Sequence, residues 1–424
     1  MPPKRALLLT TPNSYRTQDY IDAAAKLGIE AVVAVDLPRM LAEEWNFPLG
    51  ADFSHPEQAA NHIVEALETS GGSDNAEVRY DAVLALDDSG SRVAALVADA
   101  LGLPHNGPIA AEAARNKFRM RTMLAACGSP IPEFGEFRTS DNLKEIIARA
   151  EEKIGYPCVV KPEELNGSRG VIRANLRCEL ASGVRRLTSL IGDEQPFLIE
   201  GYIPGVEVAF EGLLDSDRLH CLALFDKPDP LEGPYFEETI YVTPSRLPPE
   251  MQNQIAETTE AAARGLGLQT GPIHAELRIN AEGPWIVEVA GRSIGGLCSR
   301  ILRFGMEVGN TSSLEELILR QACGLPLESL ERESHAGGVM MIPIPEGGIL
   351  RRMSGVEEAK RVAGIEDIQI TARLNQSLVP LPEGDAYLGF IFAKGLSPAE
   401  VERALRQAHS LLQFEIDPEI ALVQ

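Results

Sequence analysis

Two glutamates in a hairpin-like segment carry the clearest chemical signal in this sequence. Residues 274–292, HAELRINAEGPWIVEVAGR, alternate polar and apolar side chains on either side of a short turn. This pattern predicts a β-hairpin. A three-residue loop at 281–283, with glycine in its last position, sets Glu276 directly opposite Glu288. Facing carboxylates have Cβ atoms about 5 Å apart and repel each other, so a cation must compensate them.

Two kinds of cation could do so. Mg²⁺ prefers a few carboxylate oxygens together with phosphate oxygens and water, whereas Arg278, on the same predicted face, offers a purely structural ion pair. The register pairs Asn280 with Pro284 and places Ile286 on the face of the two glutamates. A one-residue slip would separate the carboxylates onto opposite faces. His274 shares their face, where it could touch a substrate, accept a proton or serve only as a structural histidine.

A second segment has the composition of a phosphate-binding loop. KPEELNGSRGV, residues 161–171, follows a short apolar strand that ends at Lys161. The small residues Gly167, Ser168 and Gly170 let backbone N–H groups approach phosphate oxygens closely. The spacing is not GxxxxGK[ST], which excludes a P-loop. A loop of this composition is also compatible with an ordinary turn.

Other charged residues stand where a nucleotide could meet them. Lys117 lies in a helix predicted over 110–126. The apolar strand 197–200 ends at Glu200, and the chain breaks at glycine and proline before a strand that carries Glu207. The backbone at such a strand end can hydrogen-bond a flat base edge, and a nearby carboxylate can accept hydrogen bonds from ribose hydroxyls. Taken singly, each of these three residues is more typical of a solvated surface charge.

The first hundred residues alternate short apolar runs with helical patterns. The runs lie at 5–10, 31–35 and 82–86, and the helical patterns at 18–27, 56–69 and 90–101. This alternation predicts a parallel α/β sheet. Ligands bind such sheets at the carboxyl ends of the strands, where Asp87 and Asp88 follow the third run. A solvated turn is an equally good reading of these two aspartates.

Breaks in the pattern divide the rest of the chain. The Gly/Pro-rich segment 102–108 marks a boundary near residue 110. Alternating runs at 206–214 and 219–226 predict antiparallel strands. A polar, turn-rich stretch at 325–335 marks a second boundary, and the β-then-helix patterns of 336–417 predict a small α+β unit.

Composition narrows the class of protein and its partners. The chain has 424 residues, 44% of them hydrophobic, and a formal net charge of −23. An acidic surface repels nucleic acid and anionic membranes. No apolar run approaches the roughly 18 residues that span a bilayer, and the N-terminal residues are typical of a first strand rather than a signal peptide. The six scattered cysteines predict reduced thiols and a cytoplasmic protein.

In this order, the phrases KPEELNGSRGV, IEGYIPGVEV, HAELRI and VEVAGRSIGG resemble the ATP-grasp superfamily. The similarity is greatest to bacterial L-amino-acid ligases, or dipeptide synthetases, and extends more distantly to biotin carboxylase, carbamoyl-phosphate synthase and D-alanine–D-alanine ligase. It covers nearly the whole chain. It implies an α/β fold in three parts: an N-terminal parallel-sheet domain (1–110), a two-lobed α+β ATP-grasp core (111–200 and 201–330) and a small C-terminal lid-like α+β domain (331–424).

The resemblance also implies roles for individual residues. One set would bind ATP: Lys117 and Lys161 at the phosphates, Ser168 in a mobile loop over them, Glu200 and the backbone of Gly201, Tyr202 and Ile203 at the adenine, and Glu207 at the ribose. A second set would bind metal and substrate: Glu276 and Glu288 as ligands of Mg²⁺ (or Mn²⁺), Arg292 at the acyl phosphate, and the backbone of Gly295 and Gly296 at a substrate carboxylate. Many relatives carry a further metal ligand, asparagine, where this chain has Ala290.

The implied reaction is ATP-dependent ligation of a carboxylate to an amine. The carboxylate, from an amino acid or similar molecule, is activated as an acyl phosphate and coupled to an amine, expected to be an L-amino acid, with release of ADP and phosphate. Both partners are small molecules, and a homodimer is left open. The segment 233–248 is expected near the acyl pocket. Two alternatives remain: an enzyme of purine-biosynthesis or carbamoyl-phosphate type acting on formate or bicarbonate, and a non-catalytic nucleotide-binding protein.

Overall fold

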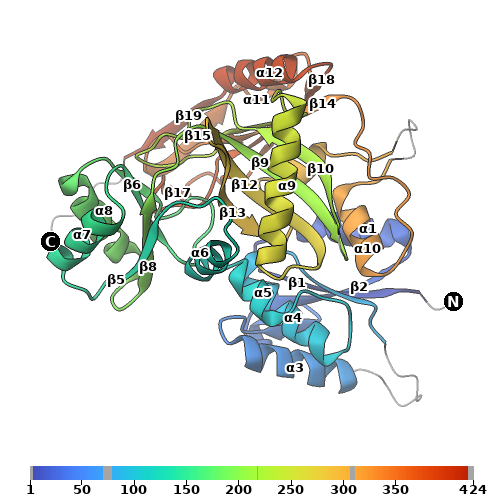
Figure 1. The fold of residues 1–424 in the computed structure, drawn as a ribbon. Coiled ribbons are helices and arrows are strands. Elements are labelled where there is room, and N and C mark those ends of the chain that lie inside the picture. The colour runs from blue at the N-terminus through green and yellow to red at the C-terminus, as the bar shows by residue number, and fades with distance from the viewer. Residues whose placement is uncertain (1–2, 70–78, 217, 306–310, 419–424) are drawn as a thin grey trace.

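The N-terminal segment of the computed structural model is a parallel sheet covered on both faces (Figure 1). The model describes residues 3–69, 79–216, 218–305 and 311–418. Strand order is β3-β2-β1-β4, with bounds β1 (Arg5–Thr10), β2 (Glu30–Asp36), β3 (Leu49–Ala51) and β4 (Ala82–Ala85). The helices are α1 (Thr17–Leu27), α2 (Arg39–Glu44), α3 (Pro56–Thr69) and α4 (Ser91–Ala100). The predicted parallel sheet is confirmed.

Alternate side chains of β1 pack into two different hydrophobic cores, one on each face of the sheet. This explains why helices cover both faces. Leu8 packs in the cluster that contains α1, whereas Leu7 and Leu9 pack in the cluster with α3 and α4. Because the strand is buried on both faces, it has to be apolar throughout. The carboxyl ends of β1 and β4 lie side by side, so the loop after β1 reaches Asp87: the Thr11 N–H donates to its carboxylate at 2.9 Å.

A four-stranded antiparallel sheet with two helices forms the small lobe. Its strand order is β5-β8-β6-β7, and the elements are β5 (Phe134–Arg138), α7 (Leu143–Lys153), β6 (Cys158–Pro162), β7 (Ile172–Ala174), α8 (Arg177–Ile191) and β8 (Pro196–Gly201). The apolar faces of α7 and α8 pack on one side of this sheet. The opposite side is therefore free to carry Lys161 and Glu200 toward the rest of the molecule.

The largest sheet has eight strands and runs through both the large lobe and the C-terminal segment. Its order is β13-β12-β9-β10-β11-β14-β18-β16. The bounds are β9 (Val206–Asp215), β10 (Arg218–Asp226), β11 (Ile240–Thr243), β12 (Thr270–Asn280), β13 (Gly283–Ala290), β14 (Ala336–Ile342), β16 (Ile365–Ile370) and β18 (Gly389–Gly395). The predicted antiparallel pairing of 206–214 with 219–226 is confirmed by β9 and β10.

Helices cover this sheet at both of its ends. α9 (Pro249–Gly265) packs on the apolar face of the large-lobe strands, and α10 (Leu314–Ala322) packs beside α1. In the C-terminal segment, α12 (Pro398–Leu411) covers β14 and β18. The remaining elements are α11 (Val356–Lys360) and a small sheet of β15 (Gly348–Ser354), β17 (Ser377–Leu378) and β19 (Gln413–Asp417). Residues 419–424 of the predicted C-terminal domain lie outside the described residues.

The prediction of a single helix over 110–126 is wrong, because two helices occupy this segment. They are α5 (Pro108–Ala113) and α6 (Lys117–Ala126). Asn116 caps the second helix by accepting a hydrogen bond from the Arg119 N–H at 2.9 Å. Its amide also donates to Glu163 at 2.7 Å, across 47 residues of sequence. The break makes Lys117 the first residue of α6, at the base of the segment 161–171.

The hairpin register is confirmed at the glutamates and wrong at the turn. Glu276 pairs with Glu288, as predicted, but Asn280 pairs with Gly283 rather than with Pro284. The loop therefore has two residues, and a bulge in β13 restores the predicted register before it reaches the glutamates. The physical reason is Ile286, which the bulge turns into the apolar core beneath the sheet, where it is fully buried.

Across the described ranges, no helix is both long and apolar enough to cross a membrane. All six cysteines fall within these ranges, and each is a free thiol.

Candidate active site

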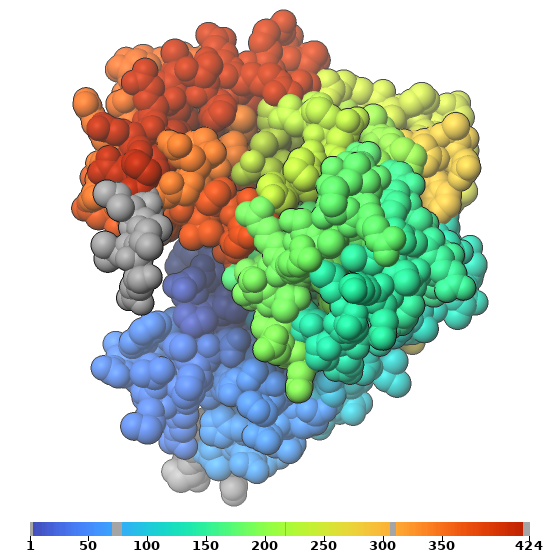
Figure 2. All heavy atoms as spheres, turned by 90° about the vertical axis from the view of Figure 1, so that its left-hand side faces the viewer, coloured from blue at the N-terminus to red at the C-terminus, as the bar shows by residue number. Residues whose placement is uncertain are grey.

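A cavity of about 570 Å³ lies where the N-terminal segment, the small lobe, the large lobe and the C-terminal segment meet. Figure 2 views the molecule from the side on which these four parts come together. Every residue proposed from the sequence lines the cavity: Lys117, Lys161, Ser168, Glu200, Gly201, Tyr202, Ile203, Glu207, His274, Glu276, Glu288, Arg292, Gly295 and Gly296. The fold thus brings together residues spread over 180 positions of the sequence, from 117 to 296.

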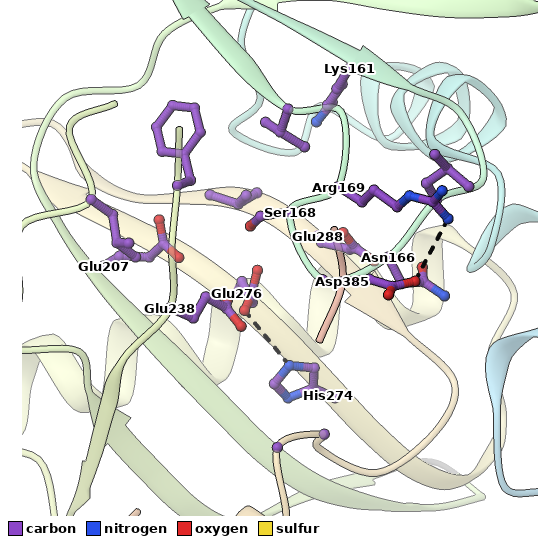
Figure 3. A pocket seen from close by; sticks show the side chains of 18 of the residues that line it. Lys161, Asn166, Ser168, Arg169, Glu207, Glu238, His274, Glu276, Glu288 and Asp385 are labelled. Atoms are coloured by element: carbon purple, nitrogen blue, oxygen red, sulfur yellow. Dashed lines mark ion pairs between the residues drawn. The ribbon is translucent and has the colours of Figure 1, made fainter. Parts of the chain in front are cut away.

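The acidic part of the cavity comes from neighbouring strands that share one face. In the register of β9 with β12, Arg278 pairs with Glu207 and Glu276 with Ala209. Because side chains alternate along a strand, Glu207, Glu276 and Glu288 all rise from the face opposite α9. Figure 3 shows Glu207, Glu238 and Glu276 converging there, with Glu288 farther along the same surface.

Lys227, just beyond the end of β10, compensates three of these carboxylates. Its Nζ lies 2.8 Å from Glu207, 2.7 Å from Glu238 and 2.6 Å from Glu276. Burial together with Glu276 raises the pKa of Glu238 to about 8, against the influence of Lys227. Lys227 in turn lowers the pKa of Glu276, although burial alone would raise it. The cluster therefore holds fewer negative charges at neutral pH than its three carboxylates suggest.

Arg278 does not pair with the facing glutamates, so the prediction that it could be their structural partner is wrong. Its Nε donates to Glu207 at 2.9 Å, and one Nη donates to the hydroxyl of Tyr202 at 2.8 Å. Glu288 is instead approached by Lys117, whose Nζ lies 3.6 Å from its carboxylate. The lysine also donates to the carbonyl of Leu165 at 2.8 Å, which ties the base of the Gly/Ser loop to α6.

Lys161 and Glu200 form a fully buried ion pair that Arg121 completes. The Lys161 Nζ donates to Glu200 at 2.6 Å, and the Arg121 Nε donates to the same carboxylate at 2.8 Å. Burial lowers the pKa of Lys161 to about 8 despite this partner. Burial alone would raise the pKa of Glu200, but Arg121 and Lys161 lower it to about 2. The Glu200 carboxylate is thus fully engaged, which leaves its backbone and its neighbours to face a ligand.

The residues after Glu200 form a flat aromatic corner. The Tyr202 ring stacks on Phe236 with centroids 6.4 Å apart, and the Arg173 guanidinium lies 3.9 Å from the Tyr202 centroid. Arg278 also donates to the Ile203 carbonyl at 2.9 Å. Aromatic faces and fixed backbone groups of this kind suit a planar heterocycle.

The Gly/Ser loop adopts left-handed backbone angles and lines the cavity. Gly167, Ser168 and Gly170 have φ values of +62°, +57° and +74°, which explains the two glycines. The Gly170 N–H donates to the Pro382 carbonyl at 2.7 Å, and Arg169 lies 3.6 Å from Asp385. The loop thus contacts the C-terminal segment directly.

Two arginines approach each other from different parts of the chain. The Arg292 Nε donates to Asp88 at 2.7 Å, and its Nη1 donates to the Ser293 carbonyl at 3.0 Å. Arg16, beside the N-terminus of α1, donates to the same Ser293 carbonyl at 3.2 Å and to the Leu86 carbonyl at 2.8 Å. The N-terminal segment therefore both orients Arg292 and supplies a second guanidinium.

Gly296 and His274 both lie close to polar groups of the protein. The Gly296 N–H donates to the hydroxyl of Tyr15 at 2.9 Å. The His274 Nε2 lies 3.9 Å from Glu276, and its Nδ1 lies 3.5 Å from Glu211 without a hydrogen bond. Burial lowers the pKa of His274 to about 3 and raises that of Glu211 well above its usual value. His274 is thus neutral near pH 7.

Sequence reasoning missed several residues of this site. Asp88 stands out in the sequence only as a residue that follows a predicted strand, and Lys227 carries no local motif, although it directly follows β10. Glu238 belongs to the segment 233–248, which was expected near the site and does line it. Arg121 and Arg16 gave no signal, because their partners come from distant parts of the chain.

Comparison with known proteins agrees with this geometry. A model of the ATP-grasp domain matches residues 154–301, and a model of the L-amino acid ligase C-terminal domain 2 matches residues 340–417. The chain belongs to the ATP-grasp superfamily. It is an ATP-grasp protein with an L-amino acid ligase C-terminal domain, and ligases of this family are ADP-forming and make carbon–nitrogen bonds.

Three known proteins are similar to this chain over about two thirds of its length or more. The crystal structure of L-amino acid ligase from Bacillus licheniformis is 26% identical, with a TM-score of 0.77 over 98% of this chain and 100% of that one. Alanine–anticapsin ligase of Bacillus subtilis is 26% identical over 67% of this chain and 65% of its own length. Carnosine synthase 1 of Gallus gallus is 27% identical over 70% of this chain. The chain spans slightly less than two thirds of the alanine–anticapsin ligase and 32% of the carnosine synthase.

Proposed function

We propose that this protein is an ATP-dependent carboxylate–amine ligase that forms an amide bond between two small molecules, the amine being an L-amino acid. The observation that carries the proposal is the composition of one cavity. The cavity combines an acidic cluster, buried lysines and a Gly/Ser loop with two neighbouring arginines, Arg16 and Arg292. The proposed domains are residues 1–110, 111–330 and 331–424.

The nucleotide is proposed to lie between the two lobes. The aromatic corner at Tyr202, with the backbone of Gly201 and Ile203, would hold the adenine, and Glu207 would accept hydrogen bonds from the ribose. Lys117 and Lys161 would neutralise phosphate oxygens, with the backbone around Ser168 closing over them. ATP-grasp proteins typically use ATP with Mg²⁺, and the residues present here suit both.

The acidic cluster has the donor chemistry that a hard divalent cation requires. Oxygens of Glu207, Glu238 and Glu276 all lie within 4.8 Å of one another, and carboxylates are preferred ligands of Mg²⁺. Glu288, opposite Glu276 in the hairpin, is the second proposed ligand. When bound, the ion would neutralise charge on the transferred phosphoryl group. Because Ala290 has no side-chain atom that could bind the ion, the carboxylates are the only side-chain ligands proposed here.

The chemistry proceeds in two transfers. An oxygen of the substrate carboxylate attacks the γ-phosphorus of ATP, the bond to the ADP oxygen breaks, and an acyl phosphate results. The amine nitrogen then attacks the acyl carbon, phosphate departs with the electron pair of the broken C–O bond, and the nitrogen loses a proton. The protein's contribution is positioning and charge neutralisation. Arg292, held in place by Asp88, would face the oxyanion that develops at the acyl carbon.

The test is a screen of amino-acid pairs for ADP release, with mass spectrometry of the products. We expect ADP, phosphate and a dipeptide or other amide in equal amounts, formed only with a divalent cation. AMP and pyrophosphate would rule out an acyl-phosphate route. Product formed only with formate or bicarbonate would move the protein to the purine-biosynthesis or carbamoyl-phosphate type, and binding of ATP without any product would indicate a non-catalytic protein.

A further inference from the structure

Arg16 differs from every other cation that lines the cavity. Five lysines and arginines of the lining each lie within 4.0 Å of a carboxylate, in the pairs Lys117–Glu288, Lys161–Glu200, Arg169–Asp385, Arg278–Glu207 and Arg292–Asp88. Within the described ranges, Arg16 has no carboxylate at that distance. Its hydrogen bonds go from Nη1 to two backbone carbonyls. A guanidinium remains charged at all physiological pH values, so this corner of the cavity carries a positive charge that no carboxylate of the described residues pairs within 4.0 Å.

The free side of this guanidinium faces the glycine pair. The Arg16 Nη2 lies 3.2 Å from the point that a Cβ on Gly295 would occupy. A side chain there would press against the guanidinium, and glycine leaves the approach open. The Gly296 N–H is already taken by the Tyr15 hydroxyl. An anion at this place would therefore meet the guanidinium rather than a pair of free backbone N–H groups.

Arg16 also lies close to the proposed acyl centre. Arg16 and Arg292 donate to the same Ser293 carbonyl, at 3.2 Å and 3.0 Å. In an α-amino acid, only one carbon separates the amine from the carboxylate. A carboxylate bound by Arg16 would thus hold its own α-amine beside Arg292, where attack on the acyl phosphate has to occur.

The wall next to Arg16 is apolar and aromatic. The rings of Tyr15 and Tyr387 each lie with their centroids 6.1 Å from that of Phe390. Met341 packs against the glycine pair so tightly that a Cβ on Gly296 would come within 2.5 Å of its sulfur. All four side chains line the cavity. A substrate side chain in this corner would contact rings and a thioether.

We propose that Arg16 binds the α-carboxylate of the amine substrate, and that this substrate is an α-amino acid with an apolar side chain seated against Tyr15, Met341, Tyr387 and Phe390. The inference rests on the proposed ligase function. The competing role for Arg16 is purely structural, because its two carbonyl bonds join the N-terminal segment at Leu86 to the core.

The experiment compares an acid with its amide as the amine substrate. The acyl donor is the amino acid that gives the highest ADP release with the wild type, and the acceptors are L-leucine and L-leucinamide, then L-phenylalanine and L-phenylalaninamide. Wild type, Arg16→Gln, Arg16→Lys and Arg303→Gln are assayed for kcat and KM. Arg303 is the matched control, because it donates to a backbone carbonyl at 2.7 Å but lies outside this cavity.

The wild type should prefer each acid over its amide by about 10- to 100-fold in kcat/KM, the range expected for one charged hydrogen bond. Arg16→Gln should lose this preference through a higher KM for the acid. Arg16→Lys should retain part of it, and Arg303→Gln all of it. A structural role predicts a different pattern, in which Arg16→Gln slows acid and amide alike and the preference survives.

The possible failures are distinct. If the wild type joins amino acids but Arg16→Gln keeps the acid preference, Arg16 is not the carboxylate ligand and the ligase function stands. If the wild type accepts only charged amino acids, the apolar wall does not receive the acceptor side chain. If no amino-acid pair yields an amide, the ligase function fails and the assignment of Arg16 fails with it.

Discussion

Replacement of Lys227 by methionine tests whether its ammonium group holds the acidic cluster together. The substitution keeps a long apolar stem and removes one charge. Lys227 is 7% exposed, so solvent screens its contacts little. At an effective dielectric constant of about 20, each contact with an ionised carboxylate near 2.7 Å corresponds to roughly 6 kcal/mol before desolvation. The raised pKa of Glu238 leaves that carboxyl protonated near pH 7, so Glu207 and Glu276 supply these contacts.

The net loss is smaller, because desolvation opposes the attraction. Removing one partner of a buried ion pair typically destabilises a protein by about 3–5 kcal/mol, since the remaining charge stays buried. We therefore expect Lys227→Met to lower the urea midpoint clearly at pH 7 in EDTA. Excess MgCl₂ should restore much of the loss, because oxygens within 4.8 Å of one another can then share a divalent cation. Wild type should respond less to MgCl₂.

Lys394→Met is the matched control for this measurement. Lys394 also pairs with a carboxylate, Glu333 at 2.8 Å, but its side chain is 34% exposed. An exposed pair contributes about 0–1 kcal/mol, so this variant should unfold nearly as the wild type does. The reasoning is refuted if the two variants lose equal stability, or if MgCl₂ stabilises wild type and Lys227→Met to the same extent.

Four further outcomes are expected. Glu276→Gln and Glu288→Gln should each lower ADP formation by about 10²-fold or more with unchanged circular dichroism; wild-type activity at limiting Mg²⁺ would exclude them as metal ligands. Lys161 should bind phosphate only when its amine is protonated, and its pKa is near 8. The affinity for an ATP analogue should therefore fall about 10-fold from pH 7 to pH 9. In Lys161→Arg this pH dependence should be absent. Arg292→Ala should lower kcat by about 10²–10³ with nearly normal binding of the analogue by calorimetry; lost binding would place Arg292 at the nucleotide instead. Hydrogen exchange in residues 163–170 should slow on addition of ATP and Mg²⁺, and unchanged exchange would argue against a mobile loop.

Local patterns in the sequence predicted the helices and strands well, but they did not predict turn lengths, bulges or helix breaks. The facing of Glu276 and Glu288 was predicted correctly because two errors offset each other: the turn is one residue shorter than expected, and a bulge in β13 adds one residue. The bulge follows from the burial of Ile286 in a core that the hairpin shares with α9. Likewise, the break before Lys117 depends on a contact between Asn116 and a residue 47 positions away.

Charge partners were the least predictable part of the site. Arg292 was expected to face the substrate, but its orientation by Asp88 spans 204 residues of sequence. Lys227 reaches Glu276 across 49 residues. Hydrophobic periodicity predicts which face of a strand is polar, but it does not say which charges of different elements meet. Arg16 stands out only because no carboxylate of the described residues lies within 4.0 Å of it, so it could not have been recognised before the fold was known.

The eight-stranded sheet has a consequence for attempts to exchange parts between relatives. β11 and β14 pair in four consecutive positions, from Ile240–Met340 to Thr243–Gly337. A cut near residue 330 would strip β11 of this neighbour and uncover the apolar cluster that both strands share. A bare, apolar strand edge recruits other chains, so a truncated protein should aggregate. Chimaeras that aim to transfer substrate preference between relatives will therefore have to exchange β11 and the C-terminal segment together.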